Sequence, residues 1–150
     1  MTKILLISSK GGHFTEIAQL KELYKDYDRF WVTIKGPDTI FSLRTEKKYF
    51  GFAPESRNTI NFFQNLHLAS RILLKEKPNI LISCGAGIAV PFFLIGKILG
   101  IKLIFIESFD YIRYPSMTGA LLYNIVDLFI VQHKVQNKWY PRAKYWGSLL

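Results

Sequence analysis

The sequence predicts an α/β fold of the Rossmann-like kind, in which a mostly parallel sheet carries helices on both faces. Short apolar runs alternate with segments of helical periodicity along the 150 residues. Two of the runs, residues 3–7 and 80–84, pass directly into glycine turns that open a helix. Nearly continuous apolar runs are typical of strands buried on both faces, and strand–helix alternation builds parallel sheets. The length suits a single domain over residues 1–150.

The first half of the chain is expected to contain two helices after the opening strand. The apolar spacing of residues 14–24 predicts a helix, and residues 29–34 a strand closed by a glycine and a proline. Residues 38–56 have no clean period and indicate an irregular connection with room for one short strand. A longer helix is predicted over residues 59–77, ended by the following proline. The residues expected to face the core from this helix are Ile60, Phe63, Leu66, Ala69 and Leu73.

The second half repeats the alternation of strands and helices. A helix that is apolar on nearly every side is predicted over residues 88–99, and a strand over residues 102–107. A short helix at residues 117–125 leads to a strand at residues 128–131, and a last strand is expected at residues 144–147. This order favours a doubly wound sheet.

The charge of the chain points to an anionic partner. The formal net charge is +9, which suits nucleic acid, an anionic lipid surface or a phosphorylated substrate. Nucleic acid is the least favoured of these, because the basic residues are dispersed and no binding signature is present. The single cysteine, Cys84, lies in an apolar run and is expected to be a buried thiol in a reducing, cytoplasmic protein. The three histidines are scattered, so neither a metal site nor a cofactor is expected.

A peripheral membrane contact is predicted from two helices. No apolar run reaches the ~20 residues of a spanning helix. On the helix at residues 59–77, His67, Arg71 and Lys75 recur every fourth residue as a basic stripe. Phe92 and Phe93 lie on the apolar helix that follows the second glycine turn. Together these residues suit an interface with anionic lipid; a solvated charged face is the alternative for the stripe.

The two glycine turns are the candidate anion-binding elements. Both follow buried strands, so in a doubly wound sheet both lie at the carboxyl edge, where ligands bind. Backbone N–H groups and the positive end of a helix dipole could hold an anion there. The residues are Gly11 and Gly12 in the first turn and Gly85, Ala86 and Gly87 in the second. The alternative is that the glycines only make tight connections, and neither turn matches a dinucleotide or Walker fingerprint.

Three further residues carry candidate chemistry. His13 begins a helix, where the dipole favours the neutral imidazole, and it could act as a general base or hydrogen-bond donor; a capping or surface histidine is the alternative. Glu16 could be a first-turn carboxylate that helps the helix start. Glu107, followed by Ser108, ends a buried strand, which favours a binding or orienting role for this carboxylate.

Several motifs together resemble one known family. The first turn looks like the Gly-Gly-His-x-x-Glu signature of the acceptor-binding subunits of two-subunit glycosyltransferases. The second is similar to their Asn-Gly-Pro-Gly-x-x-x-Pro loop. Further similar motifs follow in the same order along the chain. The matching segments are residues 9–16, 84–91, 106–108, 116–119, 127–132 and 140–147.

The resemblance implies the amino-terminal half of a GT-B fold. This chain would bind a polyprenyl-diphosphate-linked sugar at the inner face of the cell membrane, and a partner chain would bind the sugar nucleotide. His13 and Glu16 would be catalytic, and the glycine turns would hold the diphosphate or first sugar. The remaining acceptor-binding residues implied by the motifs are Glu107, Ser108, Ser116, Thr118 and Gly119. Residues 139–146, with two tryptophans, are candidates for the partner-facing end, with aromatic core packing as the alternative.

The relatives implied are the membrane subunit of the N-acetylglucosaminyltransferase that makes dolichol-linked chitobiose and its bacterial counterparts in capsule and exopolysaccharide assembly. A more distant resemblance is to the amino-terminal half of the lipid II glycosyltransferase. Cys84 and Ala86 replace Asn and Pro of the eukaryotic loop, which favours the bacterial branch. Two other readings stay open. The chain could be a non-catalytic membrane adaptor that recruits and activates the transferase, or a nucleotide-binding domain.

Overall fold

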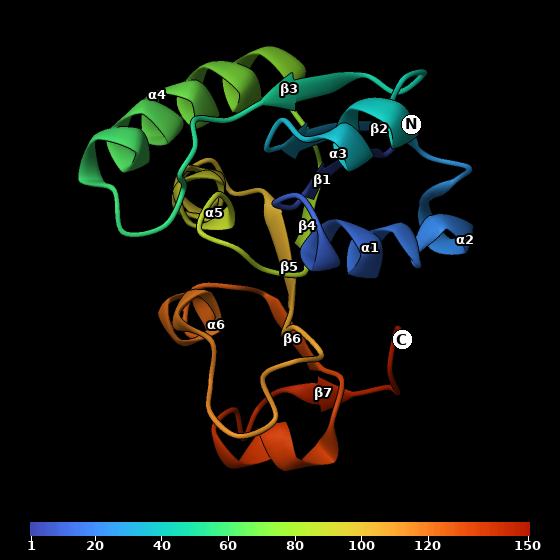
Figure 1. Ribbon diagram of the computed structural model, residues 1–150, viewed down its shortest axis with the longest axis vertical. Helices are drawn as coiled ribbons and strands as arrows, with labels where there is room; N and C mark the ends of the chain where they lie inside the picture. The colour runs from blue at the N-terminus through green and yellow to red at the C-terminus, as the bar shows by residue number, and fades with distance from the viewer.

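The sheet has seven strands, all parallel, in the order β3-β2-β1-β4-β5-β6-β7. The computed structural model describes residues 1–150 (Figure 1). The order reverses where β1 pairs with β2 on one side and with β4 on the other, so the loops after β1 and β4 leave the sheet side by side. The strands are β1 (Lys3–Ile7), β2 (Asp28–Thr33), β3 (Lys48–Phe50), β4 (Ile80–Ser83), β5 (Lys102–Ile106), β6 (Leu128–Val131) and β7 (Lys144–Tyr145).

Helices cover both faces of this sheet, as the sequence predicts. Figure 1 shows α4, α5 and α6 on one side and α1 and α2 on the other. Alternate residues of β1 supply the two cores: Leu5 and Ile7 join the core under α4 and α5, and Ile4 and Leu6 the core under α1. The helices are α1 (Gly12–Ala18), α2 (Lys21–Tyr24), α3 (Pro37–Ser42), α4 (Thr59–Glu76), α5 (Ala89–Ile98), α6 (Met117–Leu122) and the 3₁₀ helix η1 (Lys134–Lys138).

The predicted strands are all present, but the helices of the first half differ from the prediction. The single helix expected over residues 14–24 is divided into α1 and α2. Helix α3 begins one residue before the stretch interpreted as irregular and extends into it. Pro37 occupies its first turn, and the Thr39 hydroxyl accepts a bond from the Gly36 N–H at 3.0 Å. Six residues are too few for a visible period, which is why this helix escaped prediction.

Helix α4 buries part of the predicted face, including Ala69 and Leu73, but exposes the two predicted residues of its first turns. Ile60 and Phe63 are 71% and 66% exposed. The buried stripe instead includes two polar residues, Asn65 and Glu76. Asn65 is bonded to both the N–H and the carbonyl of Phe52, at 2.8 and 3.0 Å. Because buried polar groups are tolerated where they are fully bonded, a hydrophobicity pattern assigns part of this face wrongly.

Helix α5 is apolar on nearly every side because its residues from Ala89 to Gly96 are enclosed by the protein. It packs on α4, α6, β4 and β5. Phe92 and Phe93 are fully buried, and the Phe93 ring meets Phe105 edge-on with 6.2 Å between centroids. The prediction that these two residues contact a membrane is therefore wrong, and they belong to the core.

The carboxylate of Glu76 ties the edge strand β3 to α4. It accepts a bond from Lys47 Nζ at 2.8 Å and one from the Tyr49 hydroxyl, and Lys3 Nζ lies 3.5 Å away. Burial alone would raise the pKa of Glu76, but the bonds from Lys47 and Tyr49 and the two lysine charges outweigh it and lower the pKa to about 2. The same hydrogen bond, with burial, raises the pKa of Tyr49 to about 12.

We predict that Glu76 makes stability pH-dependent in the acid range. Its folded pKa lies below the ordinary value of 4.5, so its contribution is present above that value and is lost as the pH falls toward about 2. Between about pH 5 and pH 3, the wild type should lose about 2 kcal/mol relative to Glu76→Gln in urea unfolding. Glu22→Gln, which removes an exposed ion pair with Lys25, is the control, and its free energy of unfolding should fall with pH as that of the wild type does. Parallel pH profiles for wild type and Glu76→Gln would contradict this role.

Candidate functional site

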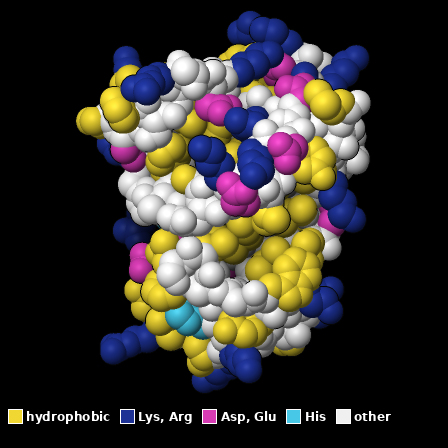
Figure 2. All heavy atoms as spheres, turned by 90° about the vertical axis from the view of Figure 1, so that its right-hand side faces the viewer, with side chains coloured by type: hydrophobic (Ala, Val, Ile, Leu, Met, Phe, Trp, Pro, Cys, Tyr) yellow, Lys and Arg dark blue, Asp and Glu magenta, His cyan; other side chains and the backbone are white.

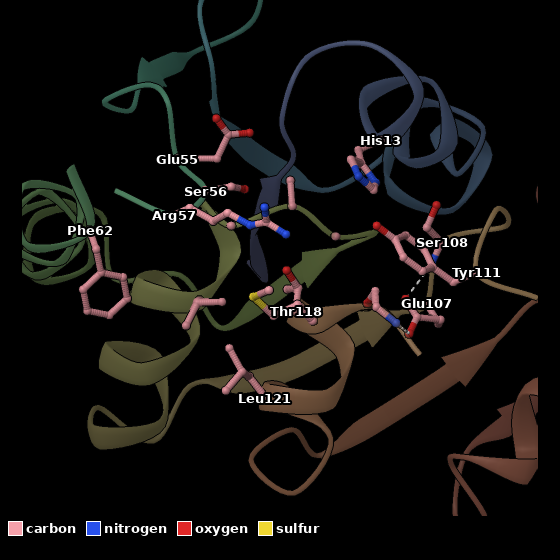
Figure 3. A pocket seen from close by; sticks show the side chains of 16 residues that line it. His13, Glu55, Ser56, Arg57, Phe62, Glu107, Ser108, Tyr111, Thr118 and Leu121 are labelled. Carbon is pink, nitrogen blue, oxygen red and sulfur yellow. Dashed lines mark hydrogen bonds between the residues drawn. The ribbon is translucent and has the colours of Figure 1, made fainter. Parts of the chain in front are cut away.

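A cleft of about 450 Å³ opens at the carboxyl edge of the sheet, beside the point where the strand order reverses. Its walls come from segments far apart in the chain: the start of α1, the loop after β3, the turn after β4, the loop after β5 and the start of α6 (Figure 3). Of the residues selected from sequence, His13, the second glycine turn, Glu107, Ser108, Ser116 and Thr118 line this cleft. Gly11, Gly12, Glu16 and Gly119 do not.

His13 is held against the second glycine turn. Its Nδ1 lies 3.2 Å from the carbonyl oxygen of Cys84. A carbonyl only accepts, so Nδ1 is the donor in this bond, and in the neutral ring Nε2 is left as an acceptor. A Cβ atom at Gly85 would lie 3.0 Å from the imidazole, and Gly85 has φ +124°, so glycine is needed at this position. The histidine is thus available as a base on the cleft wall.

The backbone amides of the two glycine turns are engaged differently. In the first, the Gly11 N–H donates to Asp38 Oδ2 at 2.7 Å, and this bond lowers the pKa of Asp38. An anion would have to displace that carboxylate to reach the Gly11 amide. In the second turn, the amides of Ala86, Gly87 and Ile88 donate to no group of the chain. Ala86 and Gly87 line the cleft, so their free amides are candidate donors to an anion there.

The loop after β3 closes on this second turn. A Cβ atom at Gly87 would lie 2.5 Å from the Glu55 carbonyl oxygen, so the two backbones touch. Glu55 in turn accepts a bond from the Ser9 hydroxyl at 2.6 Å. Sequence reasoning missed Glu55, Ser56 and Arg57 as cleft residues, because they fall in the stretch without a period. The signal that could have found them is a polar run directly before the helix cap Asn58.

Glu107 is a buried carboxylate with three donors from the chain. It is 1% exposed and accepts bonds from Tyr140 Oη at 2.5 Å, Ser108 N–H at 3.0 Å and Ser116 N–H at 3.2 Å. Burial and the bond to Glu107 raise the pKa of Tyr140, so its hydroxyl remains a donor. A carboxylate has about four acceptor positions, so one remains for a hydroxyl in the cleft.

Gly119 permits this arrangement although it lies behind the cleft wall. A Cβ atom there would lie 2.6 Å from Tyr140 Oη and would also collide with Glu107 Oε2. The Gly119 N–H is bonded to the Ser116 hydroxyl at 2.8 Å, which caps α6. Gly119 is therefore a packing residue for Glu107 rather than part of the wall.

Glu16 lies behind Ser108 and is only 2% exposed. Its carboxylate accepts bonds from the Ser108 hydroxyl and from Gln132 Nε2, both at 2.6 Å, and from the Phe109 N–H at 3.3 Å. Because it does not reach the cleft, direct catalysis by Glu16 does not fit its position. We infer that it orients the loop that begins at Ser108.

A second hollow, of about 670 Å³, lies along the outer face of α4. Ile60, Phe63, His67 and Arg71 line it, so two residues of the predicted basic stripe border exposed apolar side chains. Lys75 is absent from its lining, and its Nζ lies 5.8 Å from the centroid of the Tyr49 ring. No helix of the chain is long and apolar enough to cross a bilayer.

The sheet order and the cleft at its reversal define a Rossmann-like half of a GT-B fold. Solved structures agree: the chain superposes on MurG of Acinetobacter baumannii with a TM-score of 0.74 at 16% identity, covering 90% of this chain and 43% of that one. For a UDP-N-acetylglucosamine 2-epimerase from Rickettsia bellii the TM-score is 0.77 at 12% identity, covering 99% and 45%. The chain thus spans less than half the length of these proteins.

The chain belongs to the Alg14-like family of oligosaccharide biosynthesis proteins, whose family model matches residues 53–149. The human protein named UDP-N-acetylglucosamine transferase subunit ALG14 is 28% identical over 179 aligned positions, covering 98% of this chain and 82% of the human one. The protein of the same name from Debaryomyces hansenii is 29% identical, covering 99% and 77%. The resemblance inferred from the motifs is confirmed at the level of this family.

We predict that Gly119→Ala destabilises the chain by about 1–3 kcal/mol, because the new methyl group overpacks the Glu107–Tyr140 contact. Gly12→Ala is the matched control: nothing lies within 4 Å of a Cβ atom at Gly12, so its free energy of unfolding should stay within about 0.5 kcal/mol of the wild type. Urea unfolding measures both. Equal stabilities of the two variants would refute the packing role of Gly119.

Proposed function

We propose that this chain is the acceptor-binding subunit of a glycosyltransferase, and that a partner chain binds the sugar nucleotide. The observation that carries the proposal is a GT-B half with an open cleft that presents His13 and Glu107 together. Membership of the Alg14-like family supports it, since relatives are named as subunits of a UDP-N-acetylglucosamine transferase. In this proposal residues 1–150 act as one unit, and UDP-N-acetylglucosamine is the first donor to test.

The proposed reaction is sugar transfer to a hydroxyl of a polyprenyl-diphosphate-linked sugar. The acceptor oxygen forms the new bond to the anomeric carbon of the donor, whose bond to the nucleoside diphosphate breaks. His13 Nε2 takes the hydroxyl proton or orients the hydroxyl, because Nδ1 is engaged by the Cys84 carbonyl. Glu107 and Ser108 hold the acceptor sugar, and Ser116 and Thr118 complete the wall.

The proposed membrane contact is the outer face of α4. Ile60 and Phe63 are exposed beside His67 and Arg71, which combines apolar side chains with positive charge. These two apolar residues take the place of the buried Phe92 and Phe93 in the proposal. The chain would then sit peripherally on the inner face of the cell membrane, where a lipid-linked sugar is available.

The proposed partner contact is the face that carries the carboxyl terminus. Hydrophobic side chains gather across the middle and lower part of this face, while its Lys and Arg side chains are interspersed with Asp and Glu (Figure 2). Trp146, next to the edge strand β7, is 68% exposed. Tyr140 is buried and Trp139 packs against the core, so of residues 139–146 only the last part remains a candidate contact.

A role in bacterial capsule or exopolysaccharide assembly is the finer proposal. It rests on the second glycine turn, in which Cys84 and Ala86 stand where the eukaryotic branch has Asn and Pro. Ala86 has φ +72°, a conformation that proline cannot adopt, so this turn differs in shape from one with proline at that position. Transfer to an undecaprenyl-diphosphate-linked sugar, but not to a dolichol-linked one, is the expected specificity.

We predict that His13→Ala lowers kcat of the reconstituted two-chain enzyme by about 10²–10⁴-fold, the range for losing a general base. The measurement is sugar transfer from UDP-N-acetylglucosamine to a polyprenyl-diphosphate-linked sugar, with partner binding measured alongside. His133→Ala is the control: this histidine lies outside the cleft lining, bonded to the Phe109 carbonyl at 3.1 Å.

Unchanged turnover in His13→Ala would remove His13 as a catalytic residue and favour a non-catalytic adaptor. Transfer by this chain without any partner would refute the two-chain proposal. Tight binding of UDP to the isolated chain, with no binding of lipid-linked sugar, would favour a nucleotide-binding domain.

A further inference from the structure

Arg57 is the one lysine or arginine in the lining of the cleft. Its side chain forms no ion pair and no hydrogen bond with the rest of the chain. Figure 3 shows it reaching into the cleft from the loop after β3, with Phe62 on one side and His13 and Ser108 on the other. An unpaired guanidinium in a cleft is suited to bind an anion, because its planar donors match phosphate oxygens.

The backbone around Arg57 is fixed on both sides. Before it, Glu55 touches Gly87 of the second glycine turn. After it, the Asn58 side chain accepts the Asn61 N–H at 2.9 Å and caps α4. Arg57 itself has φ +54°, a left-handed conformation that costs a residue with a side chain about 1 kcal/mol. The surrounding contacts therefore hold this residue at the cleft.

The cleft is chemically different on the two sides of Arg57. On one side lies Phe62, whose ring packs edge-on against Phe63 of the hollow along α4 with 5.6 Å between centroids. On the other side lie the polar groups His13, Glu107 and Ser108. The order of surfaces is thus apolar, cationic, polar, which is the order of a prenyl chain, a diphosphate and a sugar.

We propose that Arg57 binds the diphosphate of the lipid-linked acceptor and so sets its direction in the cleft. The prenyl chain then leaves along α4, and the first sugar lies against Glu107 and Ser108. The inference rests on the proposed function and adds a residue and an orientation to it. Glu107 carries a carboxylate, so a phosphate placed at that end of the cleft would be repelled.

The test is binding of farnesyl diphosphate, farnesol, inorganic pyrophosphate and UDP to the full chain by calorimetry. In Arg57→Ala the affinity for farnesyl diphosphate should fall about 10–100-fold, while the affinity for farnesol should be unchanged. The affinity of Arg57→Lys for farnesyl diphosphate should lie between those of the wild type and Arg57→Ala. Arg57 is exposed, so its replacement should leave the unfolding transition in place. Arg113→Ala is the control, since Arg113 is exposed but lies outside the cleft lining.

The direction of the lipid is tested by the same probes. Farnesyl diphosphate should bind the wild type more tightly than pyrophosphate does, and Phe63→Ser should reduce this difference. Leu74→Ser, an exposed leucine of α4 outside the hollow, should leave it unchanged. An equal effect of both variants would overturn the proposed path along α4.

The failures of the inference and of the proposed function are distinguishable. If Arg57→Ala and wild type bind farnesyl diphosphate equally, Arg57 is not the diphosphate residue, and the proposed acceptor role is not contradicted. An equal loss in Arg113→Ala would reduce the effect to net charge and also overturn the assignment. If wild type binds UDP but not farnesyl diphosphate, both the inference and the acceptor role fail.

Discussion

The parallel pairing of β1 with β4 is the constraint on which the site depends. Because β1 also pairs with β2, the chain leaves the two central strands toward opposite faces of the sheet. The turns after these strands then meet at one edge, and the His13 side chain from the first reaches the Cys84 carbonyl before the second. The segments that form the cleft lie far apart in the sequence, and the register of two buried strands brings them together.

Behind the cleft wall lies a polar layer that fixes its shape. Glu16, Gln132 and Gln136 are all buried, and each is bonded to the segment between Ser108 and Tyr111 or to its flank at Glu107. Buried carboxylates and amides are costly unless their bonds are made, and here they are made to one loop. These bonds hold the irregular loop from Ser108 to Tyr111 in a single position over the cleft. A binding surface needs such a fixed position if it is to recognise one hydroxyl among several.

Most of the fold could be predicted because buried parallel strands and glycine turns have strong local signals. The strands β1, β4, β5 and β6 are continuous apolar runs, and their order follows from the alternation with helices. The error on the face of α4 has a physical cause that is not local. On α4, Asn65 and Glu76 face inward because distant groups satisfy them, and no local pattern reveals those partners.

The candidate site was predicted less completely than the fold. His13, Glu107 and the second turn carry recognisable motifs, so they could be selected from sequence. Arg57 stands in a stretch with no period, and its place in the cleft comes from the contact between Glu55 and Gly87, which is a property of the folded chain. The same holds for Glu16, whose position behind Ser108 depends on how α1 meets the loop after β5.

The burial of Cys84 makes the reactivity of its thiol a measure of local unfolding at the centre of the sheet. The thiol is fully buried next to the residues that hold His13, and burial together with the charge of Glu16 raises its pKa well above the ordinary value. Thiol reagents attack the thiolate, so the folded chain should be nearly inert to them. Since Cys84 is the sole cysteine, the rate of its modification would measure how often the centre of the sheet separates, without any label being introduced.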